Sequence, residues 1–216
     1  MVGRFGFSPW LAMLMKPKVT IRAIVDLNPN YRLLLLAWLY GFCSLLGIAQ
    51  NVGLGEKSAS LLFVAPLFLL APLWGFALFS FSSWFVFLSG KLLKGQARYR
   101  EVRAAYAWSN VPLFFNAFFW VFLIVLFGKD LFAEATLRAA LTNAKAFLLM
   151  GAVFGQVVFS IWSMVLYVAA LAEVQRFSLF RSVFNLVLGG LLFFVLAAVI
   201  SFLLIQTGLL STEFFK

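Results

Sequence analysis

Charged residues are absent from five long stretches of the chain, and each stretch is longer than the roughly 20 residues that a helix needs to cross a bilayer. Inside them apolar side chains fill nearly every position, as in the segment from Leu61 to Phe79. A transmembrane barrel strand would instead alternate apolar and polar residues over about ten positions. The charge-free stretches are Leu33–Gly55, Ser58–Gly90, Ala104–Gly128, Ala146–Ala172 and Ser182–Thr212.

This pattern predicts an all-α polytopic membrane protein, a bundle of five transmembrane helices in a single domain over residues 1–216. The spans are expected at approximately 33–50, 61–89, 109–127, 147–171 and 184–206.

Two segments outside the spans have the period of short amphipathic helices. Within the amino-terminal interfacial segment, residues 1–32, Ile21 and Ile24 share one helical face. In the second basic loop, Tyr99, Val102 and Tyr106 recur at spacings of three and four residues. The amino-terminal helix either lies in the headgroup region or packs beneath the bundle, and periodicity does not separate the two. The second helix is expected on the cytoplasmic face, leading into the third span.

The composition agrees with a membrane protein. The chain is 64% hydrophobic and 11% charged, whereas a soluble domain is about half apolar and about a quarter charged. Its single cysteine, Cys43, excludes an internal disulfide and any metal site built from several cysteines.

The distribution of basic residues predicts how the chain is oriented. Five spans leave six flanking segments on alternating sides, and Lys and Arg of short loops concentrate on the cytoplasmic side. Twelve of the 17 basic residues fall on the side of the amino terminus, so we expect that terminus in the cytoplasm and the carboxyl terminus outside. The twelve are Arg4, Lys16, Lys18, Arg22, Arg32, Lys91, Lys94, Arg98, Arg100, Arg103, Arg176 and Arg181.

The densest patch of charge lies between Lys94 and Pro112. Topology alone explains it, and a basic loop also gains about 1 kcal/mol per Lys or Arg near an anionic leaflet. Anionic lipid headgroups on the cytoplasmic side are therefore the expected partners. A nucleic-acid partner is not expected, because binding would need a basic surface on a folded module that reaches the phosphates.

The inventory of reactive groups argues against an enzyme. The chain has no histidine, and its seven acidic residues all lie at span ends or in loops. Catalysis needs groups that transfer protons, attack a substrate or bind a metal. We expect no catalytic residue, no metal and no cofactor.

Neutral polar side chains in or near the spans allow two interpretations. If they converged on one cavity, they would line a path for a small solute or a lipid headgroup. If they stay apart, they bond between helices, for about 0.6 kcal/mol each on average. Nothing in their spacing groups them, which favours the second interpretation. The candidates are Asn110, Asn116, Gln156, Asn185 and Gln206.

Gly151 and Gly155 form a small-xxx-small pair in the fourth span, a spacing that lets helix backbones approach closely. Packing inside the bundle is the commoner use of such a pair. Packing between two copies in a homo-oligomer is the alternative.

Two stretches of the chain resemble one known family. The first holds Gly95, Tyr99, Arg100, Glu101, Tyr106 and Pro112, and the second runs from Trp162 through "LAEVQRFSLFR". Together with "KPKVTIRAI" before the first span, they are similar to the Yip domain family of Ypt/Rab-interacting membrane proteins, in its bacterial branch. Gln175 stands where that family often has histidine.

The resemblance implies five spans, a cytoplasmic amino terminus, no catalytic activity and a place in a bacterial cytoplasmic (inner) membrane. Eukaryotic members bind prenylated Rab-type GTPases and one another, and act in membrane traffic. The Asp-Leu-x-Gly-Pro motif of that branch is absent here.

The sequence thus favours a non-enzymatic Yip-type scaffold or adaptor that serves membrane organisation or trafficking-like binding of lipids, other membrane proteins or a second copy. The alternative is a small-solute permease, a channel or a lipid-translocating protein. On the cytoplasmic surface we expect Glu173 to meet Arg100 or Arg103, and Glu101 to meet Arg176. The candidate surface residues are Gly95, Tyr99, Arg100, Glu101, Arg103, Tyr106, Pro112, Glu173, Gln175, Arg176, Phe177 and Ser178.

Overall fold

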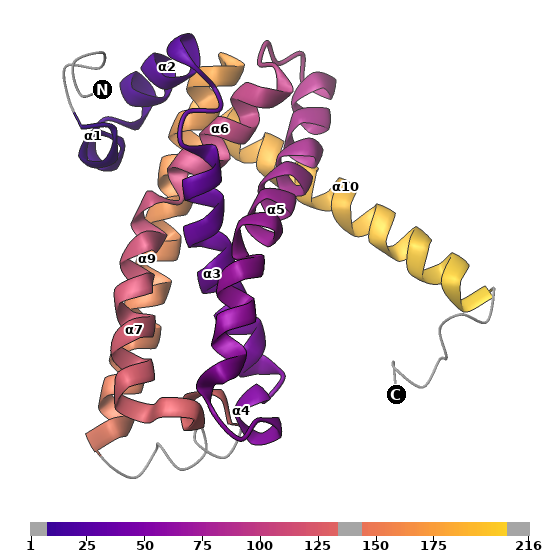
Figure 1. Cartoon of the computed structure of the whole chain (residues 1–216). Coiled ribbons are helices and arrows are strands. Elements are labelled where there is room, and N and C mark those ends of the chain that lie inside the picture. Colours follow the sequence, from indigo (N-terminus) through magenta and orange to yellow (C-terminus); the bar gives the residue numbers. More distant parts are fainter. Residues whose placement is uncertain (1–7, 134–143, 207–216) are drawn as a thin grey trace.

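A computed structural model describes residues 8–133 and 144–206, and every regular element in these ranges is helical. Five of the helices are long and apolar enough to cross a membrane (Figure 1). The prediction of an all-α protein with five membrane spans is confirmed. Of the basic residues used to predict the orientation, Arg4, Arg138 and Lys216 lie outside the described ranges.

Each predicted span coincides with one long helix. Short 3₁₀ turns extend two of these helices: η2 (Leu61–Phe63) precedes α5, while η3 (Val111–Phe114) and η4 (Gly128–Phe132) flank α7. The five helices are α3 (Leu33–Asn51), α5 (Val64–Leu92), α7 (Phe115–Phe127), α9 (Ala144–Gln175) and α10 (Leu179–Gln206).

Helices α3 and α5 approach each other closely because small residues face each other where they meet. A Cβ atom at Gly41 would overlap the backbone of Ala71, and a Cβ atom at Gly75 would overlap the backbone of Ala37. Ala37–Gly41 and Ala71–Gly75 both have the small-xxx-small spacing that permits such contact. The tightest helix contact in the bundle therefore depends on two glycines.

The glycine pair predicted to pack in the fourth span behaves differently. Gly155 faces the ring of Phe119, but the space beside Gly151 is open. The pair does not make a close crossing within the chain, because α9 turns Gly151 outward.

Helix α10 leaves the bundle after its first turns (Figure 1). Its buried residues are Ser182, Asn185 and Gly189, all near its beginning. The ring of Phe193 still contacts Phe81 of α5, at a centroid distance of 5.9 Å. Beyond that point the helix diverges from the other four.

Three short helices, α1 (Pro9–Met15), α2 (Pro17–Leu27) and α6 (Tyr99–Ser109), gather at one end of the bundle (Figure 1). Each buries apolar side chains, as Met13 and Ile24 show, whereas Leu11, Met15 and Val19 are exposed. The amino-terminal helices therefore pack against the bundle and also present apolar side chains outward. Helix α4 (Leu54–Lys57) lies at the opposite end, against η4.

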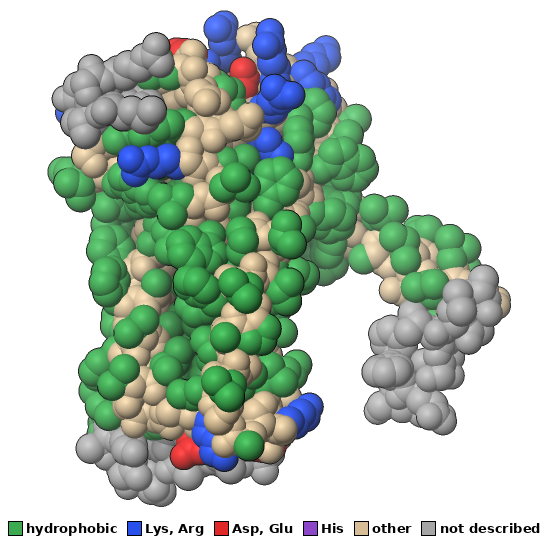
Figure 2. All heavy atoms as spheres, viewed as in Figure 1, with side chains coloured by type: hydrophobic (Ala, Val, Ile, Leu, Met, Phe, Trp, Pro, Cys, Tyr) green, Lys and Arg blue, Asp and Glu red, His purple; other side chains and the backbone are tan. Residues whose placement is uncertain are grey.

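Most exposed cations also gather at the end of the bundle that carries α6 (Figure 2). We call this the basic end. Its exposed cations are Lys16, Lys18, Arg32, Lys91, Lys94, Arg98, Arg100, Arg176 and Arg181.

Candidate functional site: the paired turns of the basic end

Two helix-ending turns of the same shape lie next to each other at the basic end. The turn after α5 passes through Lys94, with φ 58°, and the turn after α9 passes through Arg176, with φ 56°. Both residues are in the left-handed conformation that commonly ends a helix. We call the two segments, residues 90–97 and 172–178, the paired turns.

Equivalent hydrogen bonds close the two turns. The N–H of Gly95 donates to the carbonyl of Gly90 at 2.7 Å, and the N–H of Phe177 donates to the carbonyl of Ala172 at 2.8 Å. This bond is the mark of the Schellman motif, which satisfies carbonyl groups left free at a helix end. Each turn is therefore closed by its own backbone.

The side chain of Gln175 joins the two turns. It is 1% exposed, and its Oε1 accepts a hydrogen bond from the N–H of Ala97 at 3.3 Å. Its backbone carbonyl accepts another from the N–H of Gln96, also at 3.3 Å. A Cβ atom at Gly90 or Gly95 would overlap its amide group. Gln175 thus lies inside the junction, and the prediction that it belongs to an exposed surface is corrected.

A second amide ties α10 to the same junction. The hydroxyl of Ser89 donates to Oδ1 of Asn185 at 2.6 Å, and both side chains are fully buried. The amide nitrogens of Asn185 and Gln175 are buried without a hydrogen-bond partner in the described structure. Asn185, a candidate for an intramembrane lining, is therefore a connector between α5 and α10.

Glu173 binds α2 to the junction. Nε of Arg22 lies 3.1 Å from Oε1 of Glu173, and Nη2 of Arg22 donates to the Glu173 carbonyl at 2.7 Å. The expectation that Glu173 would meet Arg100 or Arg103 is wrong, because α2 packs over the end of α9 and supplies the nearer cation.

Glu101 closes the beginning of α6. Its Oε2 accepts the N–H of Arg98 at 2.9 Å, which is the acidic half of a capping box. The expected contact with Arg176 is therefore replaced by a helix cap.

Arg103 faces α5 and the start of α3. Its Nη2 donates to Oδ1 of Asn30 at 3.1 Å, and its Nη1 donates to the hydroxyl of Ser80 at 3.4 Å. The guanidinium also lies over the rings of Phe76 and Tyr99, 5.0 Å and 5.5 Å from their centroids. Such cation–π contacts hold the guanidinium plane in place.

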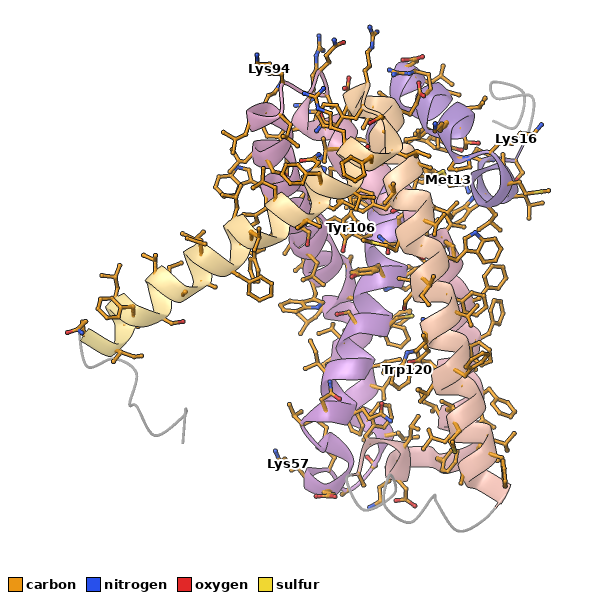
Figure 3. The ribbon with its side chains drawn as sticks, turned by 180° about the vertical axis from the view of Figure 1, so that it is seen from behind. Met13, Lys16, Lys57, Lys94, Tyr106 and Trp120 are labelled. Atoms are coloured by element: carbon orange, nitrogen blue, oxygen red, sulfur yellow. The ribbon has the colours of Figure 1, made fainter. Side chains whose placement is uncertain are left out.

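Tyr106 connects α6 to the interior of the bundle (Figure 3). Its hydroxyl lies 3.4 Å from that of Tyr40, and its ring lies 5.0 Å from the ring of Tyr167. Burial raises the pKa of Tyr106 well above its usual value, and the hydroxyl of Tyr40 raises it further. Pro112 is buried in η3, where α6 passes into α7.

The predicted surface therefore divides into two groups. Arg100, Arg176 and Ser178 are exposed. The hydroxyl oxygen of Ser178 accepts the N–H of Arg181 at 3.3 Å, near the start of α10. The other predicted residues are buried or partly buried. They are Gly95, Tyr99, Glu101, Arg103, Tyr106, Pro112, Glu173, Gln175 and Phe177.

The candidate lining residues do not converge within the described ranges. Asn110 donates to the Tyr106 carbonyl at 2.7 Å, and Gln206 is exposed at the end of the diverging α10. Gln156 is half-buried on α9, whereas Asn116 is buried on α7 and its Oδ1 has no hydrogen-bond partner.

Five apolar helices with a hydrogen-bonded polar junction at one end define an integral membrane protein. The Yip1 domain family matches residues 11–206. The chain belongs to this family, and the resemblance seen in the sequence is confirmed. No curated protein and no solved structure matches the chain.

Proposed function

We propose that this protein is a non-enzymatic scaffold or adaptor of a bacterial cytoplasmic membrane, with the basic end in the cytoplasm. Its partners would be anionic headgroups and acidic segments of other membrane proteins, which the exposed cations attract. This role is the one that the family and the distribution of charge support best.

The observation that carries the proposal is the construction of the paired turns. Gln175, Asn185 and Glu173 hold α2, α5, α6, α9 and α10 together at one place. The exposed cations of the basic end stand on this junction, so the backbone that carries them is held in one arrangement. A backbone held in this way loses little conformational freedom when it binds a partner.

The polar side chains of the basic end also support a structural role. Glu101 caps α6, the hydroxyl of Ser178 accepts an N–H at the start of α10, and Asn185 bonds to α5. Groups used in this way connect helices, whereas a catalytic group must be available to a substrate.

Site-specific photo-crosslinking tests the proposal in the full-length protein within its native membrane. A crosslinking residue is placed at Arg100 or Arg176, and a matched one at Lys57 of the opposite end. We expect the same discrete protein adducts from both basic-end positions and not from Lys57. Adducts that are absent from Arg100 and Arg176, or equal at all three positions, would contradict the adaptor role.

A further inference from the structure

A groove runs along the lipid-facing side of α5, beside the place where α10 leaves the bundle. It has a volume of about 630 Å³, within the usual range of small-ligand sites. Its long wall is apolar and includes Trp74, Leu78 and Phe81, and at Ser80 it meets Tyr99 of α6. An elongated apolar ligand would fit this shape.

One cation, Arg103, lies next to the polar part of this groove without lining it. Arg103 is one helical turn after Tyr99 on α6, and its Nη1 reaches Ser80, which lines the groove. The hydrogen bonds of Arg103 go to neutral oxygens of Ser80 and Asn30, and its Nε is buried without an acceptor in the described structure. A guanidinium has five N–H donors, so it retains donors for an anion.

The depth of Arg103 matches that of lipid phosphates. Its other partner, Asn30, lies just before Arg32, after which the charge-free stretch of α3 begins. The guanidinium is therefore at the polar edge of the apolar bundle. From Ser80 the groove continues along α5 to Trp74, which is on the apolar side of that edge.

Arg103 differs from Lys94 and Arg100 in being held in place. Lys94 and Arg100 are exposed and attract any anionic surface. The guanidinium of Arg103 is instead fixed between Tyr99 and Phe76. Its planar fork matches phosphate oxygens in a way that an exposed lysine does not.

From this juxtaposition we propose a binding site for one anionic phospholipid. The phosphate accepts hydrogen bonds from Arg103, and one acyl chain lies in the groove along Leu78 and Trp74. The site goes beyond the adaptor role and does not depend on it, because it faces the bilayer and not a protein partner.

Native mass spectrometry of the full-length protein in neutral detergent tests the site. Phosphatidylglycerol is added to one sample and phosphatidylcholine with the same acyl chains to another. We expect a single phosphatidylglycerol adduct, about tenfold tighter than the phosphatidylcholine adduct, because the choline cation of phosphatidylcholine offsets the phosphate charge that phosphatidylglycerol presents to Arg103. Equal binding of the two lipids overturns the proposal, because it would show no preference for a net anionic headgroup.

Three variants locate the adduct. Arg103→Gln should weaken phosphatidylglycerol about tenfold, while Arg100→Gln, which removes an exposed cation of the same helix, should leave it unchanged. Ala77→Trp, which fills the groove and keeps Arg103, should remove the adduct. A thermal unfolding midpoint like that of the wild type shows that each variant is folded.

The remaining outcomes each overturn the proposal. If Arg103→Gln still binds phosphatidylglycerol as the wild type does, Arg103 does not bind the headgroup. If Arg100→Gln weakens binding as much as Arg103→Gln does, the lipid is held only by diffuse attraction to the basic end. If the wild type is a dimer without lipid preference and Ala77→Trp makes it a monomer, the groove is an interface between two copies. The adaptor role is unaffected by these results, because its crosslinks are read at Arg100 and Arg176.

Discussion

Arg22 and Glu173 are 151 residues apart in the sequence and are joined by two hydrogen bonds, one to the carboxylate at 3.1 Å and one to the backbone carbonyl at 2.7 Å. Both side chains are about one third exposed, at 33% each. The pair fixes the amino-terminal helices to the end of α9, immediately before Arg176 turns the chain toward α10. The position of α2 thus depends on the fourth span.

Removal of this pair should loosen the basic end. We expect Arg22→Ala to lower the free energy of unfolding by about 1 kcal/mol, since two hydrogen bonds are lost but solvent already screens the partly exposed charges. Denaturant unfolding in detergent measures the change. Lys18→Ala, an exposed cation of the same helix, is the control and should stay within about 0.5 kcal/mol of the wild type. Equal effects of the two substitutions would show that the pair does not fasten α2.

The contact of Gly95 with Gln175 predicts a repairable defect. Gly95→Ala places a methyl group against the buried amide and should destabilise the protein by about 1–3 kcal/mol, the usual effect of overpacking. Gln175→Ala removes the side-chain obstacle and leaves the carbonyl of Gly90, 2.9 Å from the added carbon, so in the double variant the added cost of Gly95→Ala should fall without disappearing. A thermodynamic cycle of the four proteins measures this coupling.

The control for that cycle is Gly190→Ala, because nothing lies within 4 Å of a Cβ atom there. It should be neutral or slightly stabilising, since alanine favours a helix over glycine by up to about 1 kcal/mol. Strictly additive effects in the cycle would refute the interlock between the turns.

The crossing of α3 and α5 predicts a stronger defect. At Gly75 the obstacle to a side chain is the backbone of Ala37, which cannot move aside as a flexible side chain can. Gly75→Ala should therefore destabilise the bundle by about 3 kcal/mol or more. Gly47→Ala on α3, where the space is open, should be tolerated. Thermal unfolding of the two purified variants compares them, and equal midpoints would argue against a tight crossing.

The orientation of the basic end is testable with single cysteines in a Cys43→Ser background. If the basic end is cytoplasmic, an impermeant thiol reagent applied to intact cells should label Lys57→Cys and leave Lys94→Cys unlabelled. After lysis both should react. Labelling of Lys94→Cys in intact cells, with Lys57→Cys protected, would reverse the orientation.

The permease alternative predicts water in the middle of the bundle. Asn116 is buried, so Asn116→Cys in the same background should resist the thiol reagent even after lysis, while Lys57→Cys reacts. Rapid labelling of Asn116→Cys would reveal a hydrated path and favour transport over the adaptor role.

The main elements of the fold follow from the sequence, because the cost of burying charge in a bilayer acts on every residue of a span. The break at Lys91 therefore marks the end of the second span without further information. The return of apolar residues after Arg103 comes before the third span, because residues up to Ser109 belong to α6. The amphipathic period of α6 was also sufficient to predict which side of this helix is buried, since Val102 is fully buried on the expected side.

The connections at the basic end do not follow from local pattern. Gln175 lies between Glu173 and Arg176 in the sequence, and these charged neighbours indicate an exposed loop. Its burial depends on Gly90 and Gly95 of another hairpin, which leave room for its amide. The pairing of Glu173 with Arg22 likewise depends on how α2 folds back, which no local spacing encodes. The small-xxx-small spacing of Ala71 and Gly75 is visible in the sequence and indicates the close crossing of α3 and α5, but it was not used to predict that crossing.

The departure of α10 from the bundle has a consequence for the bilayer around it. At 1.5 Å per residue, the 28 residues of α10 measure about 42 Å, whereas the 19 residues of α3 measure about 28 Å. A hydrocarbon core of about 30 Å matches α3 when that helix stands upright, and it matches α10 only when that helix is strongly tilted. The two helices are thus suited to one bilayer at different angles, and a thicker membrane would draw α10 toward the bundle axis.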